Sequence, residues 1–174
     1  DGQLADLAAT VSDGATVEII TDRSPEALDI MRHSMAHVMA EAVQELFPGA
    51  QIGFGPATED GFFYDFALEQ PVSTDDFAAI EAKMAEIIAK DEPFVREVLT
   101  YEGAKEAFKD QRLKSEHIDD LPADEDITLY RHGSFVDLCS GPHVPSAGKL
   151  GAFKLMKTAG AYWKGDADNE MLTR

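Results

Sequence analysis

The chain has 174 residues, 44% of them hydrophobic, which is enough for one substantial domain with its own core. It carries 33 acidic against 15 basic residues, and a net charge of −18 excludes a protein that holds nucleic acid through a broad basic surface. It contains no membrane-spanning apolar run, no export signal and only one cysteine, so we expect a cytoplasmic protein without membrane contacts or an internal disulfide.

The first part of the chain predicts a short extended segment followed by a long helix. Residues 16–21 are rich in β-branched side chains. Ser24-Pro25-Glu26 is typical of a helix N-terminus, with Ser24 as the cap and proline at the first helical position. Apolar residues then recur with helical spacing as far as Leu46, and Pro48-Gly49 predicts the end of the helix.

The rest of the chain predicts a mixture of strands and helices. Residues 51–56 and 61–66 are aromatic-rich strands around a polar turn and predict a hairpin. Ser73-Thr-Asp-Asp76 resembles a capping box in front of a second helix that stops at Pro93. The later elements are a strand at 94–100, a helix at 102–108, a polar turn-prone segment at 110–126, and two strands at 127–131 and 134–138 joined at His132-Gly133. This order predicts an α+β fold, with a long central helix packed against an antiparallel sheet and a short β-rich remnant in front.

Two short motifs hold the only cysteine and three of the five histidines, namely His33-Ser-Met-Ala-His37 and Cys139-Ser-Gly-Pro-His143. Residues four apart share one face of a helix, so His33 and His37 are expected to point the same way. They lie roughly opposite the apolar stripe of their helix, so a functional site requires another segment to cover that face. Gly141-Pro142 predicts a sharp turn that presents the second pair from a loop.

Several chemistries fit these four side chains. Three imidazoles and a thiol make a sensible tetrahedral zinc set. Without metal, the same set could hold a water molecule and move its protons, with Asp137 orienting an imidazole or accepting a proton. Cys139 as a nucleophile would need a histidine to raise its thiolate population, and no acyl-enzyme signature surrounds it. Backbone amides of the glycine-proline loop could bind a carbonyl or phosphate oxygen.

The residues around these motifs resemble one family, the N-terminal editing domain of bacterial-type threonyl-tRNA synthetase. The matching runs are LYRHGSFVDLCSGPHVP from Leu129, FKLMKTAGAYWKGD from Phe153, GFFYD from Gly61, and the His33 to His37 motif. Residues 1–22 resemble the last strands of the TGS domain that precedes editing in that family. The resemblance therefore implies a C-terminal remnant of a TGS-like domain at 1–22 and an editing domain at 23–174.

The resemblance implies hydrolysis of serine wrongly esterified to threonine tRNA. A synthetic pocket that accepts threonine cannot strongly reject the smaller serine, so a second pocket excludes the threonine methyl group and cleaves what fits. An activated water would attack the aminoacyl ester, and the terminal adenosine hydroxyl would leave. The implied partners are threonine tRNA, chiefly its aminoacylated 3′ end, and the remainder of a full-length synthetase. The chain has no ATP-binding or amino-acid-activating motif, so we do not expect it to charge tRNA alone.

The resemblance also assigns roles to individual positions. The positions that match editing residues are His33, His37, Lys114, Asp137, Cys139 and His143. His33 is expected to position the water, while Lys114 and Asp137 balance charge or move protons. Cys139, His37 and His143 would shape the serine pocket. The expected substrate-binding residues are Tyr64, Gly55, Gly141 and Pro142. Ser140 stands where the family has arginine, which puts a tRNA contact from that position in doubt.

The resemblance favours editing without a cofactor, because the family's editing site is thought to work without bound metal. The related alanyl-type editing domains use the His33, His37, Cys139 and His143 pattern for zinc, so a zinc-dependent aminoacyl-tRNA deacylase stays open as an alternative. A non-catalytic module that binds the tRNA end also stays open. Residues 141–174 carry five basic against three acidic residues, and an anionic partner would be tolerated there.

Overall fold

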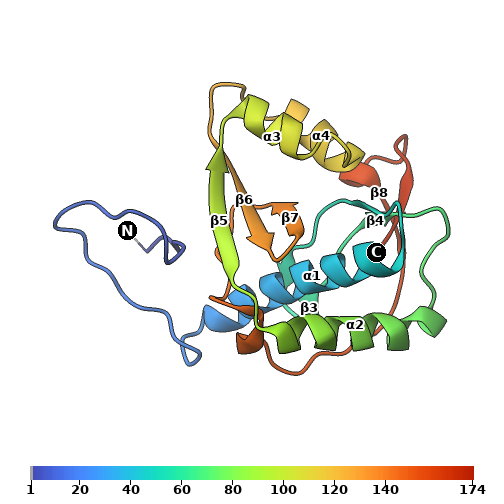
Figure 1. The fold of residues 1–174 in the computed structure, drawn as a ribbon, viewed down its shortest axis with the longest axis horizontal. Helices are drawn as coiled ribbons and strands as arrows, with labels where there is room; N and C mark the ends of the chain where they lie inside the picture. The colour runs from blue at the N-terminus through green and yellow to red at the C-terminus, as the bar shows by residue number, and fades with distance from the viewer. Residues whose placement is uncertain (1) are drawn as a thin grey trace.

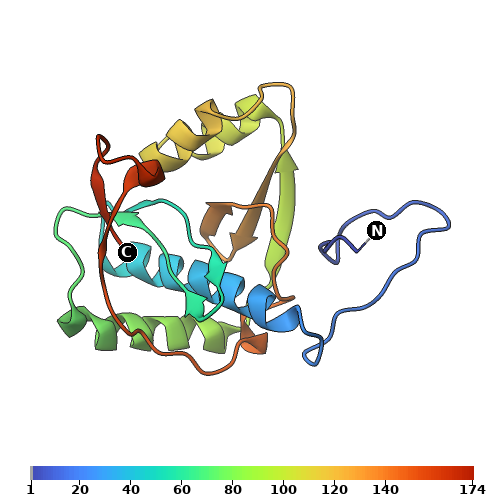
Figure 2. The same ribbon diagram turned by 180° about the vertical axis from the view of Figure 1, so that it is seen from behind.

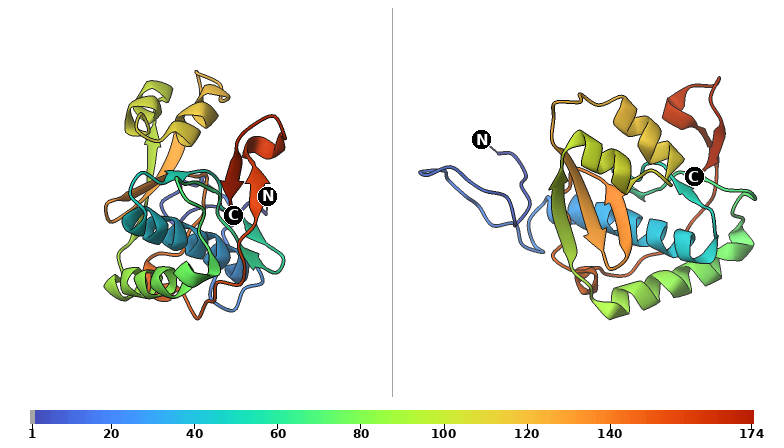
Figure 3. Two further views of the ribbon diagram at one scale, coloured as in Figure 1. Left: turned by 90° about the vertical axis from the view of Figure 1, so that its right-hand side faces the viewer. Right: turned by 45° about the horizontal axis from the view of Figure 1, so that its top comes forward.

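The computed structural model describes residues 2–174. Four α-helices and three antiparallel sheets form one body from residue 27 onward, and this confirms the predicted α+β class (Figure 1). The long helix lies in the middle of that body, with the second helix along one side and a sheet on another (Figure 3).

The central helix α1 (Ala27–Leu46) is buried on more than one side. It begins at Ala27 rather than next to Ser24, because the Ser24 hydroxyl accepts the Thr21 amide at 3.0 Å and caps no helical amide. Four of its small or branched side chains are completely buried: Ala36, Val38, Ala40 and Ala42. The small size of the alanines lets neighbouring elements approach the helix backbone closely.

The second helix α2 (Phe77–Lys90) packs along α1 and contributes Ile80, Met84 and Ile87 to the core. Ser73 and Asp76 form the predicted capping box in the short turn η1 (Thr74–Asp76) that leads into it. The core between the two helices therefore follows from apolar periodicity and from the chemistry of the helix start.

The predicted hairpin at 51–66 is confirmed as two short paired sections. Gln51–Ile52 (β1) pairs with Phe66–Ala67 (β4), and Ala57–Thr58 (β2) pairs with Gly61–Phe62 (β3). The strands β8 (Gly160–Tyr162) and β9 (Met171–Thr173) extend the first pair to a sheet of order β1-β4-β9-β8. Seen from behind, the chain reaches β8 by an extended segment past α2, where Leu155 N donates to Glu81 at 2.8 Å (Figure 2).

The second main sheet has the order β5-β6-β7 and places Asp137 and Cys139 over α1. Its strands are β5 (Phe94–Leu99), β6 (Ile127–His132) and β7 (Phe135–Leu138). Phe94 and Phe135 share the apolar core with α1, so this packing brings the end of β7 above the face that carries His33 and His37.

Residues 110–126 were predicted to be a turn-prone segment without regular structure, and this prediction was wrong. The segment contains helix α4 (Arg112–Asp119), which follows α3 (Tyr101–Ala107). Few of its residues are apolar, so its sequence carries little helical periodicity. Leu113 and Ile118 are nevertheless completely buried and fix the helix against its neighbours. Tertiary packing outweighs the weak local signal here.

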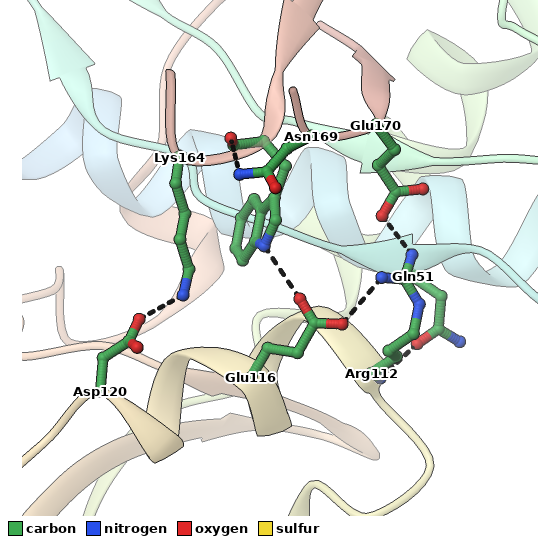
Figure 4. Close-up of polar contacts among 8 residues, drawn as sticks. Gln51, Arg112, Glu116, Asp120, Lys164, Asn169 and Glu170 are labelled. Carbon is green, nitrogen blue, oxygen red and sulfur yellow. Dashed lines mark hydrogen bonds and ion pairs between the residues drawn. The ribbon is translucent and has the colours of Figure 1, made fainter. Parts of the chain in front are cut away.

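Polar contacts hold α4 against the end of the chain (Figure 4). Glu116 accepts from Trp163 Nε1 at 3.1 Å, and Arg112 pairs with Glu116 and Glu170. The Arg112 amide also donates to Gln51 Oε1 at 2.6 Å, where the first hairpin begins. These links orient the helix turn that carries Lys114, one of the predicted site residues.

The prediction of β-structure in residues 1–22 is wrong for the described part of that segment, since no strand occurs within residues 2–26. Val17 and Ile19 are 61% and 75% exposed. A strand needs the hydrogen bonds of a neighbouring strand, and residues 16–21 have none among the described residues. Within residues 2–174, no helix combines the length and the apolar character needed to cross a membrane.

Candidate functional site

The two sequence motifs meet in one cluster, with a donor atom of each of the four residues within 4.8 Å of the others. Helix α1 presents His33 and His37, and the loop after β7 presents Cys139 and His143. His33 Nε2 lies 2.8 Å from Cys139 Sγ, which lies 3.5 Å from His143 Nε2. From the sequence, a functional site requires another segment to cover the face of α1 that carries His33 and His37. The loop from residue 139 to 144 is that segment.

Ser34, a residue that the sequence reasoning did not single out, fixes the His143 ring. Its hydroxyl donates to Ile30 O at 2.9 Å, which uses its only proton. The same oxygen lies 3.1 Å from the Val144 amide and 2.9 Å from His143 Nδ1, so both of these groups must donate to it. His143 therefore carries its proton on Nδ1 and directs the lone pair of Nε2 toward Cys139. The available signal was Ser34's position between the two histidines of the first motif.

Cys139 is a thiol at neutral pH rather than a thiolate. Burial, together with the nearby Asp137 carboxylate, raises its pKa to about 12. The Gly141 amide donates to Sγ at 3.1 Å, and the thiol proton is available to His33 Nε2. Because the thiolate is the reactive form, this environment disfavours Cys139 as a nucleophile.

Asp137 is the charged centre of a second buried layer. Its Oδ1 lies 2.5 Å from Lys114 Nζ, and its Oδ2 accepts from Tyr64 Oη at 2.5 Å. His37 Nε2 lies 3.4 Å from the same Oδ2. Lys114 and Asp137 are each 1% exposed, so the two charges must compensate each other. Four separate elements, the first hairpin, α1, α4 and β7, supply this layer.

Both predicted substrate-binding glycines, Gly55 and Gly141, make room for tyrosine rings. A Cβ atom on Gly55 would lie 2.0 Å from the Tyr64 ring, and one on Gly141 would lie 2.1 Å from Tyr130 Oη. Gly141 also has φ +70°, which glycine adopts without strain. It is joined to Pro142 by a cis peptide bond, and both residues are half-buried beside the cluster. Ser140 is exposed.

Phe94 is a second residue missed by the sequence reasoning, and no local pattern marks it. Its ring stacks on His143 with centroids 4.8 Å apart and planes 7° apart. His33 also stacks on His143, with ring centroids 4.5 Å apart. Two stacked rings therefore hold the imidazole of His143 in addition to its bond to Ser34.

The histidines of the cluster are neutral at pH 7. Burial lowers the pKa of His37 and His143 well below 6.5, and neighbouring histidines lower both further. Burial also lowers the pKa of His33, where the nearby Asp137 carboxylate acts in the opposite direction. Burial raises the pKa of Tyr64, as does Asp137. Neutral imidazoles can accept protons, which suits them to water activation.

The same four residues also fit a metal ion by chemistry, since three imidazoles and one sulfur lie within 4.8 Å. The Nε2 lone pair of His143 already points at the cluster. Zinc would require Cys139 to lose its proton, which an adjacent cation favours. A bound zinc ion would supply Lewis-acid activation of a water molecule.

Gly55→Ala tests the packing of Tyr64. The new Cβ would overlap the ring at 2.0 Å and displace it from Asp137, so we expect a loss of about 1–3 kcal/mol in the free energy of unfolding. Gly61→Ala is the matched control in the same hairpin, because a Cβ there meets nothing within 4 Å. Urea denaturation measures both variants, and equal stability of the two would contradict the described packing.

Folding keeps His37 and His143 neutral, and this predicts loss of stability in mild acid. Both pKa values lie below 6.5 in the folded state, so the unfolded chain binds more protons as the pH falls through 6.5. The free energy of unfolding should be level above this pH and fall below it, by at most about 1.4 kcal/mol per pH unit for each histidine. Urea denaturation between pH 5 and 7.5 measures the slope. His143→Gln should reduce the slope, and an unchanged slope would contradict the assignment.

Comparison with known proteins identifies relatives of the chain. Residues 127–174 match the family described as the threonyl and alanyl tRNA synthetase second additional domain. The whole chain is 54% identical over 176 residues to the threonine–tRNA ligase of Polynucleobacter asymbioticus, and 56% identical over 178 residues to that of Hyphomonas neptunium. It spans only 28% and 27% of the length of these two proteins. The chain is therefore homologous throughout to a segment of threonine–tRNA ligases, and the match of its residues 127–174 to the second additional domain agrees with this.

Proposed function

We propose that this chain is the editing segment of a threonyl-tRNA synthetase and that it hydrolyses serine wrongly esterified to threonine tRNA. The observation that carries the proposal is the convergence of three neutral histidines and a thiol above the buried Lys114–Asp137 pair. The homology to threonine–tRNA ligases supports the choice of tRNA. Within the proposal, residues 23–174 form the editing domain and residues 1–22 belong to a preceding TGS-like domain.

His33 is the group proposed to position the attacking water. It is half-buried, whereas His37 and His143 are 3% and 6% exposed, so water reaches His33 most readily. Its Nε2 faces the Cys139 thiol at 2.8 Å, so a bound water would replace the thiol as the donor to this nitrogen. The water oxygen attacks the ester carbonyl, and its proton passes to the imidazole.

Lys114 and Asp137 are proposed to balance the charge that this attack creates. Negative charge develops on the carbonyl oxygen, and a buried ammonium group stabilises such charge strongly because water does not screen it. Asp137 lies 2.5 Å from Lys114 and compensates its charge in the interior. When the ester bond breaks, the adenosine oxygen takes up a proton and leaves, so the overall reaction consumes one water and releases serine.

Cys139, His37 and His143 are proposed to form the wall that excludes threonine. His143 is held by Ser34 and Phe94, so this wall cannot easily move aside for an extra methyl group. A rigid wall converts a difference of one methyl group into steric repulsion, and repulsion discriminates more strongly than a loss of contact area. The proposed partners are threonine tRNA and the rest of the synthetase, in the cytoplasm.

Single-turnover deacylation of serine-charged threonine tRNA tests the mechanism. His33→Ala, Lys114→Ala and Asp137→Ala should each lower the rate about 100-fold or more, in line with the usual contribution of a positioned acid or base. Lys109→Ala is the control, since its exposed side chain pairs with Glu106 away from the cluster. Full activity in all three variants would exclude the mechanism. Equal hydrolysis of serine- and threonine-charged tRNA would exclude the proposed wall.

A zinc-dependent deacylase is the second candidate, because the donor set fits the metal. Under the metal-free mechanism proposed above, purified protein should retain no stoichiometric zinc after dialysis, since Cys139 keeps the proton that zinc binding would remove. Elemental analysis of the wild type and of Cys139→Ser measures this. Stoichiometric zinc that disappears in Cys139→Ser would establish the zinc-dependent alternative.

A further inference from the structure

A second group of metal-ligating side chains lies behind the candidate site. Glu41 on α1, Glu92 before β5 and His132 at the end of β6 each place one donor atom within 4.8 Å of the others. Glu41 and His132 are 5% and 1% exposed, and Glu92 is half-buried. None of the three residues belongs to the mechanism proposed above.

His132 is only half satisfied in this position. Its Nδ1 lies 2.6 Å from Glu41 Oε2, a contact in which the nitrogen donates. Its Nε2 is buried and has no hydrogen-bond partner among residues 2–174. A carboxylate that orients one imidazole nitrogen and leaves the other free is the usual arrangement around a metal-binding histidine. A buried lone pair without a partner otherwise costs free energy.

The charge of the group also favours a cation. Glu41 and Glu92 bring two carboxylates to one imidazole, and within the described residues neither forms an ion pair with lysine or arginine. Glu92 is held close to His132 by the next residue, because a Cβ on Gly133 would lie 2.1 Å from Glu92 Oε2. Burying carboxylates without a compensating cation is unfavourable.

Solvent reaches the group from the surface. A hollow of about 170 Å³ borders Glu41 and is lined by Gln44, Glu45, Ser134 and Phe135. It brings solvent up to the Glu41 carboxylate, and Glu92 is itself half-buried, so solvent reaches two members of the group.

We propose that His132 Nε2 and Glu92 bind a divalent transition-metal ion of the manganese type, with Glu41 holding the His132 ring through Nδ1. An imidazole, a carboxylate and water ligands suit manganese, whereas the sulfur-containing cluster around Cys139 suits zinc. The ion would join α1, the start of β5 and the end of β6. Because Phe94 stacks on both His132 and His143, it would brace the same part of the fold that holds His143.

Binding of Mn²⁺ to the dialysed chain tests the proposal, with the free ion measured by electron paramagnetic resonance. We expect one saturable site, and at least tenfold weaker binding in Glu41→Gln and His132→Gln. Cys139→Ser should bind as the wild type does, and so should Glu102→Gln, which changes an exposed carboxylate on α3. Saturating Mn²⁺ should also raise the melting temperature of the wild type but not of Glu41→Gln.

The same titration can overturn the proposal. Absence of saturable binding up to millimolar Mn²⁺ would exclude the site. Loss of binding in Cys139→Ser with retention in Glu41→Gln would assign the ion to the other cluster instead. If Glu41→Gln and His132→Gln do not fold, Glu92→Gln takes their place in the titration, because Glu92 is only half-buried. Unchanged binding in that variant would also count against the site. All of these outcomes are independent of tRNA hydrolysis.

Discussion

The buried pair of Lys114 and Asp137 is the interaction on which the rest of the site depends. Each charge would be strongly disfavoured in the interior alone, and the two are compatible with folding only because they lie 2.5 Å apart with Tyr64 as a further donor. Four elements must be correctly placed at once to satisfy Asp137. The polar layer therefore specifies one arrangement of the hairpin, α1, α4 and β7, in addition to what apolar packing requires.

The imidazole cluster is built in a complementary way, by enclosure rather than by charge. Aromatic rings and short polar side chains surround the histidines and leave them neutral, with their protons assigned by neighbours such as Ser34. The two layers thus place proton acceptors next to a fixed positive charge. In the proposed hydrolysis, the acceptors would take the proton of the attacking water while the buried charge pair balances the charge that develops.

Much of this arrangement could be predicted from the sequence where the signal is local. Apolar periodicity predicted α1 and α2, and the Ser73 to Asp76 pattern predicted a capping box. The four-residue spacing of the first motif predicted that His33 and His37 point the same way from their helix. Helix α4 was missed because two buried residues and several long-range polar contacts hold it, and these contacts have no local signature. Phe94 was missed for the same reason, since its meeting with His143 depends on how β5 and the 139–144 loop pack. Residues 16–21 have strand-like composition but lack a partner, and composition alone cannot supply one.

The environment of Cys139 has a consequence for the chemical durability of the protein. Oxidants and alkylating reagents attack the thiolate, and they react slowly with a cysteine that keeps its proton. The same burial that withholds the sulfur from catalysis thus protects it from sulfenic acid formation and from mixed disulfides. A site of the proposed kind, built around a protonated thiol, would keep its composition under oxidative stress, when a reactive cysteine in the same place would be oxidised.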